Sequence, residues 1–328
     1  MKLKAAPWLF IGAFALFPAA FASVPNIERT ITVPRVDGSP VQLFVSLPEG
    51  AGKVPLVLMV DGSGCVSSKR EDFRANYLAV GGRVGRPVAT LAVEKPGVET
   101  GASWGSKCSE TFLRYYSIDQ RVLDHLRAIQ HLRKHASWWN GEIYLYGWSD
   151  GGMIAAHVAA YTPEVKRVVL GGTGGGIPMT IQFEQYFMCA PDRTKDRDAC
   201  LAGLRKQIQE IKDNPTPLKT WSGDDNSYRT WATRFDAIEY NIIRDLNIPV
   251  LIAHGAQDRD GTPVESAREL MRLLKADGPT NVEYWEIPSM GHGIGNVEPV
   301  RREKLLNAMY NWLLAQPTGP GGPPAFGL

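Results

Sequence analysis

The sequence has few cysteines and no clusters of charge. Four cysteines occur in 328 residues, and none forms a C-x-x-C pair or stands at ligand spacing from a histidine. A structural zinc site needs such spacing, so we expect neither a bound metal nor another cofactor. The 36 Lys and Arg residues are interspersed with 34 Asp and Glu residues, which gives a net charge of +2 without a basic run. A nucleic-acid partner is therefore not expected.

The N-terminal region lacks the cysteine that a lipoprotein signal would need. Lys2 and Lys4 precede an apolar run over residues 5–20, and a small-x-small site ends at Ala22. This order predicts a secretory signal peptide, residues 1–22. The alternative is an uncleaved anchor, which is disfavoured because the run is short and contains two prolines. We expect no stable membrane anchor and a secreted or periplasmic mature protein.

Export makes the four cysteines candidates for two disulfides. Four cysteines allow three pairings, and the sequence alone does not decide among them. Sequence proximity favours Cys189 with Cys200, which leaves Cys65 with Cys108.

The chain alternates between strand and helix patterns. Residues 29–36 and 41–47 alternate polar with apolar and predict an antiparallel hairpin. Short apolar runs, typical of strands buried on both faces of a parallel sheet, occur at 54–60, 87–93, 143–146, 165–170, 249–253 and 282–287. Helical patterns lie between them, at 71–80, 118–135, 152–161, 264–274 and 301–314. The alternation predicts an α/β fold with a doubly wound, mostly parallel sheet.

One interval interrupts this alternation. Residues 172–247 contain no buried-strand pattern, but they contain helical patterns at 198–213 and 231–246. A connection of this length usually has structure of its own, so we expect a helical cap over the strand ends, inserted in one domain of residues 23–316. The alternative is an insertion away from the site. The Pro- and Gly-rich residues 317–328 are expected to be a flexible tail.

The most informative segment is residues 142–152, where a strand pattern runs directly into a helix pattern through Gly147-Trp148-Ser149-Asp150-Gly151. This is the G-x-S-x-G nucleophile elbow. The serine of such a bend has a strained backbone, so the residues two positions either side must be small. The following helix points its N-terminus at Ser149, where positive potential would stabilise an oxyanion. Ser149 is the predicted nucleophile.

A serine nucleophile needs a base, and the base needs an acid that orients it. Of the six histidines, His292 follows the last predicted strand in a glycine-flanked loop, so it is the expected base. His125 is expected on the polar or boundary face of the 118–135 helix. The acid should follow an intervening strand, where Asp258 and Asp260 both occur. We expect Asp258, because Asp260 is farther from the strand and could cap the next helix.

Backbone N–H groups must bind the oxyanion. One is expected from Asp150, the residue after the nucleophile, and the second from Ser63, with Gly62 the next choice, in the turn after an earlier strand. The side chain of Asp150 is a tentative docking point for a substrate amine, and the alternative is a helix-capping aspartate. Trp104, in a glycine-rich loop expected to overhang the site, and Trp148, beside the nucleophile, are tentative substrate-binding residues.

These motifs resemble the α/β-hydrolase family in the elbow, in the chain order Ser149, Asp258, His292, and in the Gly62–Gly64 turn. The likeness covers the mature chain from the hairpin to the last helix, and it implies a serine hydrolase. The run 147–152 is similar to the elbow of valacyclovir-hydrolase-like esterases, which act on amino-acid esters. Those enzymes usually have histidine-glycine where this chain has Asp61 and Gly62. Dienelactone-hydrolase-like and prolyl-oligopeptidase-like enzymes are the alternatives within the family.

The resemblance and the site residues together predict an exported serine carboxylesterase that acts on a small-molecule ester through an acyl-enzyme. The alternative is an exported peptidase or amidase that acts on short or aminoacyl substrates with the same three side chains. A catalytically silent binding protein on this scaffold is the alternative from another class. The sequence leaves the substrate, the acyl-chain length and the oligomeric state open.

Overall fold

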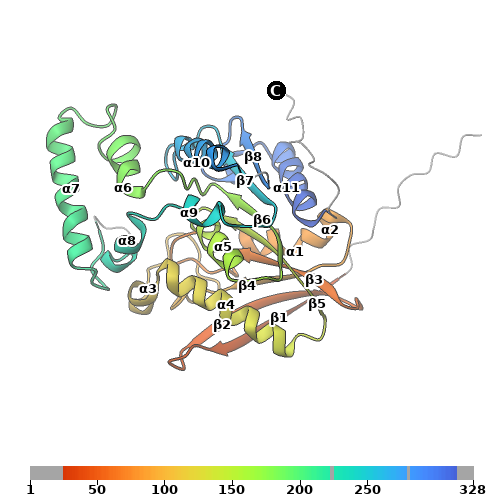
Figure 1. Ribbon diagram of the computed structural model, residues 1–328. Helices are drawn as coiled ribbons and strands as arrows, with labels where there is room; N and C mark the ends of the chain where they lie inside the picture. Colours follow the sequence, from red (N-terminus) through yellow and green to blue (C-terminus); the bar gives the residue numbers. More distant parts are fainter. Residues whose placement is uncertain (1–24, 222–224, 279–280, 316–328) are drawn as a thin grey trace, which may run out of the picture.

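The computed structural model describes residues 25–221, 225–278 and 281–315 (Figure 1). The expected signal peptide at 1–22 and the expected tail at 317–328 lie outside these residues. Within the described part of the chain, no helix has the length and apolar character needed to span a bilayer.

One sheet of eight strands organises the described residues, with the strand order β1-β2-β4-β3-β5-β6-β7-β8. The strands are β1 (Asn26–Pro34), β2 (Pro40–Pro48), β3 (Val54–Val60), β4 (Ala89–Val93), β5 (Trp139–Trp148), β6 (Val165–Gly171), β7 (Val250–Gly255) and β8 (Val282–Ile287). β2 pairs antiparallel with both β1 and β4, and the remaining neighbours are parallel. This confirms the predicted mostly parallel sheet with an antiparallel hairpin at its N-terminal edge.

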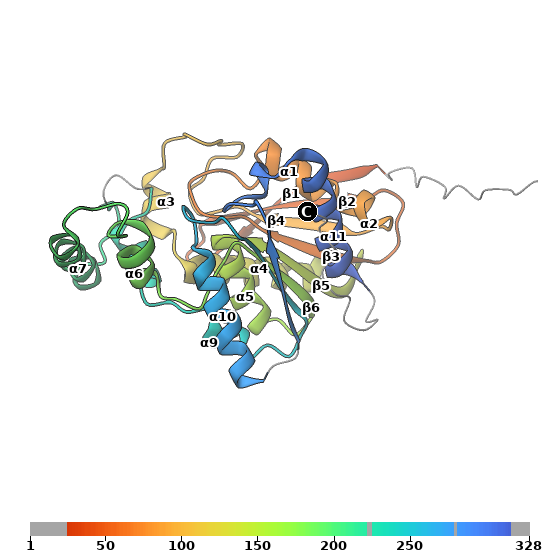
Figure 2. The same cartoon turned by 90° about the horizontal axis from the view of Figure 1, so that it is seen from above.

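Helices cover both faces of the sheet (Figures 1 and 2). On one face the core contains side chains of α4 (Ile118–His135), α5 (Asp150–Ala160), α9 (Tyr240–Ile243) and α10 (Val264–Asp277). On the other face it contains side chains of α1 (Glu71–Leu78), α2 (Val80–Val84) and α11 (Pro299–Leu314). The strand side chains that alternate between these two cores are apolar on both faces, which is why the sequence shows continuous apolar runs.

The connection between β6 and β7 forms α6 (Met179–Gln182), a π-helical turn (Phe183–Phe187), α7 (Arg197–Asp213), α8 (Tyr228–Arg234) and α9. Here α6, α7 and α8 are called the cap. In Figures 1 and 2 these helices lie to one side of the sheet. The cap has its own aromatic core, made by Phe183, Trp221, Trp231 and Phe235. The helix predicted over 231–246 is divided into α8 and α9, and the short α3 (Glu110–Tyr115) was not predicted.

Candidate active site

Ser149 lies at the bend between β5 and α5, with φ of 56° and ψ of −127°. This backbone conformation is unusual for a residue with a side chain, and it requires glycine on both sides. A Cβ on Gly147 would lie 2.2 Å from the carbonyl oxygen of Gly151. A Cβ on Gly151 would lie 2.1 Å from the carbonyl oxygen of Val60 in β3. The sequence therefore folds this way only because both positions lack a side chain.

The structure brings together Ser149, His292 and Asp258, which follow three different strands. The Nε2 atom of His292 lies 2.8 Å from the Ser149 hydroxyl oxygen. Its Nδ1 atom lies 2.7 Å from Oδ2 of Asp258. The imidazole therefore bridges the hydroxyl and the carboxylate, which is the geometry that a base and its orienting acid need.

Asp258 is fully buried and its second oxygen is held by the backbone. Its Oδ1 accepts the N–H groups of Gly261 at 3.2 Å and Thr262 at 3.1 Å. Burial alone would raise the pKa of Asp258, but hydrogen bonds from His254 and His292 outweigh it and hold the pKa well below its usual range. Asp258 is therefore a fixed carboxylate beside His292.

Asp260, the other candidate acid, points to solvent. Its side chain is 89% exposed and forms an ion pair with Arg193 at 3.2 Å. The turn that separates the two aspartates also makes room for the base. A Cβ on Gly261 would lie 2.0 Å from Cγ of His292, so this glycine lets the imidazole pass close to the backbone.

Trp148 contacts the loop of the base. Its Nε1 donates a hydrogen bond to the carbonyl oxygen of His292 at 2.7 Å. A Cβ on Gly171 would collide with its ring, at 1.9 Å. Trp148 also lines a cavity beside Ser149, so the residue expected to contact substrate has a second task, which is to fix the backbone of His292.

The turn after β3 lies beside the nucleophile, where a Cβ on Gly62 would lie 3.8 Å from Cβ of Ser149. The carbonyl oxygen of Gly62 lies 3.3 Å from Nζ of Lys95 and 3.3 Å from Nη1 of Arg121. In a trans peptide the C=O and the following N–H point in opposite directions, and no peptide bond of the described chain is cis. The two buried cations hold the carbonyl of Gly62 inward, so the N–H of Ser63 points outward. Ser63 lines both cavities that contain Ser149.

The N–H of Gly62 is already engaged, because it donates to Oδ1 of Asp61 at 2.8 Å. Of the two candidates in this turn, the geometry favours Ser63 over Gly62. Asp61, at the position where valacyclovir-hydrolase-like esterases usually have a histidine, is buried between Arg70 at 2.6 Å and Lys95 at 2.5 Å. Burial would raise the pKa of Asp61, but Lys95 and Arg70 outweigh it, and the pKa lies below its usual value.

Asp150 is nearly buried, and its carboxylate is occupied. Oδ2 accepts from Nη2 of Arg234 at 2.7 Å, from Nη1 of Arg121 at 3.3 Å, and from the hydroxyl of Tyr116. Burial would raise the pKa of Asp150, but Arg234 and Arg121 outweigh it and lower the pKa. A carboxylate that already faces two guanidinium groups has little attraction left for a substrate amine, which argues against the expected docking role.

Two cavities flank the nucleophile, and both include Ser63, Ser149 and His292 in their lining. The first cavity, of about 690 Å³, is lined in part by aromatic rings. These include Trp104, whose ring lies 5.3 Å from the Arg70 guanidinium carbon. The cap-side cavity, of about 500 Å³, lies against residues of the cap. Two spaces that meet at one hydroxyl suit the two halves of a cleavable substrate.

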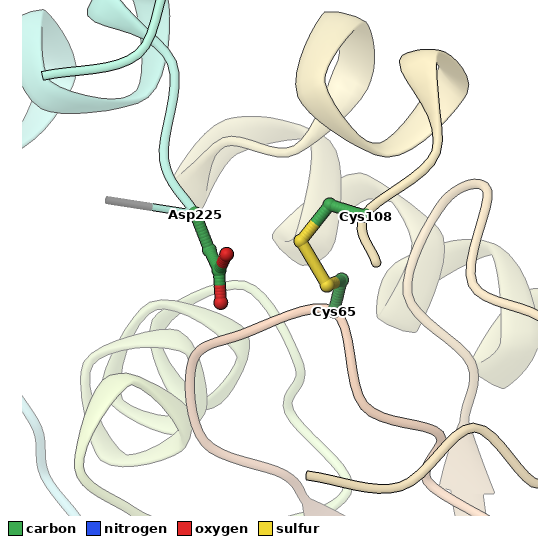
Figure 3. A group of neighbouring side chains, drawn as sticks. All are labelled: Cys65, Cys108 and Asp225. Atoms are coloured by element: carbon green, nitrogen blue, oxygen red, sulfur yellow. A yellow bond between two sulfur atoms is a disulfide. The ribbon is translucent and has the colours of Figure 1, made fainter. Parts of the chain in front are cut away.

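Two disulfides join Cys65 to Cys108 and Cys189 to Cys200. The first follows the turn of Ser63, and the carboxylate of Asp225 from the connection before α8 points toward it (Figure 3). Ligand-type atoms of Cys65, Cys108 and Asp225 lie within 4.8 Å of one another. Because both sulfur atoms are bonded to each other, they offer no thiolate to a metal ion. This cluster is therefore a cross-link beside an acidic residue, and its donor set does not fit a metal site.

Several residues of the site escaped sequence reasoning. Lys95, Arg121 and Arg234 lie far from the elbow in the chain, and no motif contains them. His125, expected on a polar or boundary face of α4, is instead almost fully buried. Burial and the nearby Arg121 lower the pKa of His125 to about 3. No local pattern marks Lys95, Arg121 and Arg234, because the groups that they contact lie elsewhere in the chain.

Comparison with known sequences identifies the family of this chain. The sequence profile of the alpha/beta hydrolase family matches residues 57–302, so the chain belongs to the alpha/beta hydrolase family. Among curated proteins the chain is 30% identical, over 148 residues, to 2,6-dihydropseudooxynicotine hydrolase of Paenarthrobacter nicotinovorans; the match covers 45% of this chain and 35% of that protein. It is 25% identical, over 142 residues, to esterase FrsA of Klebsiella pneumoniae subsp. pneumoniae, covering 43% and 30% respectively. The matched region spans about a third of these relatives.

Solved structures share the fold. Est1E from Butyrivibrio proteoclasticus has a TM-score of 0.58 at 16% identity, over 88% of this chain and 99% of Est1E. A puromycin-hydrolyzing peptidase of Mycobacterium tuberculosis has a TM-score of 0.57 at 18% identity, over 92% of this chain and 41% of the peptidase. At these identities the likeness shows the fold alone.

Proposed function

We propose that the protein is an exported serine hydrolase that cleaves carboxylic esters through Ser149, His292 and Asp258. The observation that carries the proposal is the pair of hydrogen bonds on one imidazole, 2.8 Å to the serine hydroxyl and 2.7 Å to the aspartate carboxylate. A strained serine at the N-terminus of α5 and the names of the curated relatives, a hydrolase and an esterase, point the same way.

The reaction begins when His292 Nε2 takes the proton of Ser149 and the serine oxygen attacks the ester carbonyl carbon. Asp258 keeps the other ring proton on Nδ1 and stabilises the imidazolium. The carbonyl oxygen becomes an oxyanion, to which the N–H groups of Asp150 and Ser63 donate. When the C–O bond breaks, the alcohol leaves with the proton from Nε2. Water then loses a proton to Nε2, attacks the acyl-enzyme and releases the acid, and the proton returns to Ser149.

Export is the second part of the proposal. The two disulfides suit an oxidising compartment, and the predicted signal peptide gives the route. N-terminal sequencing of the protein purified from the secreted or periplasmic fraction should begin at Ser23. Recovery of the full-length chain from the cytoplasm, with four free thiols, would contradict export.

The test of chemistry uses a fluorophosphonate probe and a panel of aryl esters and arylamides. Wild-type protein should be labelled at Ser149 and should hydrolyse aryl esters, and Ser149→Ala should abolish both. Ser137→Ala, at an exposed position before β5, is the matched control and should change neither. Faster release of arylamides than of esters would favour the peptidase alternative, and absence of labelling in the folded protein would favour a silent binding protein.

A further inference from the structure

The cap-side cavity contains a carboxyl group that the proposed reaction does not use. The group belongs to Glu239, at the N-terminal end of α9, a helix that packs against α5 and α10 (Figure 1). The cavity also includes Ser149 and His292, so Glu239 shares one space with the nucleophile.

Glu239 is buried without a compensating charge in contact. It is 5% exposed, and the backbone of Gly175 approaches so closely that a Cβ there would lie 3.2 Å from Oε2. Among the described residues no other side chain donates a hydrogen bond to this carboxyl group, and its own backbone N–H is the donor it has. Burial, with the charge of Asp150 as a smaller cause, raises the pKa of Glu239 to about 7. An unpaired buried carboxyl is costly unless something binds it.

The other charged groups that line this cavity have partners. Arg234 donates to Asp150 at 2.7 Å, and Arg193 donates to Asp260 at 3.2 Å. Glu239 is therefore the charged residue of the lining for which no counter-ion is seen within the described chain. A cationic group in this cavity would be bound without breaking either existing pair.

A second acceptor belongs to another residue of this lining. Gln182, which is 4% exposed, lines the cavity, and its Nε2 donates to the carbonyl oxygen of Ile177 at 2.7 Å. That bond fixes the orientation of the amide, because the reversed amide would place two oxygens together. Within the described residues Oε1 has no donor. A buried carboxyl without a side-chain donor and a buried amide oxygen without any donor suit a ligand that supplies N–H groups.

We propose that the cap-side cavity binds the ammonium group of the substrate, and that Glu239 is its specificity-determining partner with Oε1 of Gln182 as a second acceptor. The inference rests on the proposed esterase function and names its substrate class, which is esters that carry a primary amine on the acyl or the alcohol part. When the ammonium group binds, protonated Glu239 releases its proton to the solvent, and the resulting carboxylate forms an ion pair with the ammonium group in the cavity.

The experiment compares ammonium esters with neutral isosteres in which CH3 replaces NH3⁺. For the acyl side the pair is the 4-nitrophenyl esters of 6-aminohexanoic and heptanoic acids. For the alcohol side it is 6-aminohexyl and heptyl acetates. Glu239→Gln keeps the shape of the side chain, and Glu269→Gln is the matched control, because Glu269 pairs with the exposed Arg272 on α10.

The measured quantity is the ratio of kcat/KM for the ammonium ester to kcat/KM for its isostere. We expect Glu239→Gln to lower this ratio at least about tenfold in one of the two pairs, as loss of a desolvated ion pair does. The neutral esters form no ion pair with Glu239, so their kcat/KM should stay within about twofold of wild type. Glu269→Gln should change neither the ratio nor kcat/KM for the neutral esters. The pair that responds shows which half of the substrate enters the cavity.

An unchanged ratio in both pairs would overturn the inference while leaving the esterase proposal intact. An equal loss on neutral and ammonium esters would also overturn it, because Glu239 would then support the fold and not the substrate. If wild type and Ser149→Ala hydrolysed the neutral esters at the same rate, the proposed function would fail, and this inference with it.

Discussion

Replacing Asp258 by asparagine should disable the base without disturbing the fold, and the structure explains why. Two backbone N–H groups, from Gly261 and Thr262, point at Oδ1 of Asp258. The amide oxygen of asparagine must take that place, so its NH2 group faces Nδ1 of His292. The opposing preference comes from His254, whose Nε2 lies 3.4 Å from Oδ2. That contact is long, and the same Nε2 lies closer, at 3.0 Å, to the carbonyl oxygen of Thr262, so the two N–H groups decide the orientation.

The imidazole must then accept a hydrogen bond at Nδ1 and keep its proton on Nε2. A protonated Nε2, 2.8 Å from the hydroxyl of Ser149, cannot take the serine proton. The same substitution in serine proteases lowers kcat about 10⁴-fold, which corresponds to about 5.5 kcal/mol of lost transition-state stabilisation. We expect a loss of that order for Asp258→Asn.

The assay is kcat for a 4-nitrophenyl ester, with the thermal unfolding midpoint as a check on folding. Asp260→Asn is the matched control, because Asp260 is exposed and two residues away. It should keep kcat within about twofold, as surface substitutions away from a site generally do. A kcat for Asp258→Asn within tenfold of wild type would refute the tautomer argument. An equal loss in Asp260→Asn would refute the assignment of the acid.

Three further outcomes follow from packing and charge. Replacing Cys65 and Cys108 together by serine opens a cross-link with a sequence separation of 43 and should lower the free energy of unfolding by about 4 kcal/mol. The kcat of this double variant should also fall, because the turn of Ser63 loosens. An unchanged denaturant midpoint would contradict the expected loss of stability. Gly151→Ala should cost at least about 3 kcal/mol or abolish folding, since its Cβ would meet the backbone of β3 at 2.1 Å. Gly203→Ala, in an open position of α7, should instead add about 0.5–1 kcal/mol, and chemical denaturation of both measures the contrast. The pKa of Glu239 is raised above its ordinary value of 4.5. The contribution of Glu239 to the stability of the fold is therefore fully present below pH 4.5 and is lost as the pH rises through about 7. The free energy of unfolding of wild type should therefore fall, relative to Glu239→Gln, by on the order of 3 kcal/mol across that window, and parallel stability curves would contradict the assignment.

Much of the fold could be predicted because its signals are local. Strands buried on both faces appear as apolar runs, and the 118–135 helix was predicted with the bounds that α4 has in the structure. The prediction failed where local signals are weak. The six-residue α3 is too short to show a period, and the pattern over 231–246 reads as one helix although Asp236 and Ala237 separate α8 from α9.

The site, too, contains residues that local motifs predict and residues that they do not. The strained conformation of Ser149 requires a glycine two residues before it and another two residues after it, so a five-residue motif predicts the elbow. The carbonyl of Gly62 is held by Lys95 and Arg121, which are 33 and 59 residues away in the chain, and only the folded sheet brings them together. The role of Asp150 depends on such a distant partner too. From the sequence its carboxylate looked available to substrate, but Arg234 of α8 reaches it across 84 residues.

The distribution of charge around Ser149 gives the two sides of the site different tasks. The buried carboxylates of Asp61 and Asp150 are outnumbered by the cations that contact them, Arg70, Lys95, Arg121 and Arg234. Lys95 and Arg121 lie behind the turn of Ser63, where their positive charge favours an oxyanion and opposes a bound cation. On the cap side, Glu239 has no side-chain donor and Oε1 of Gln182 has no donor among the described residues. In the complex that we propose, a substrate with an ammonium group is repelled from one end of the site and bound at the other, so the charges that favour the oxyanion also orient the ester toward the nucleophile.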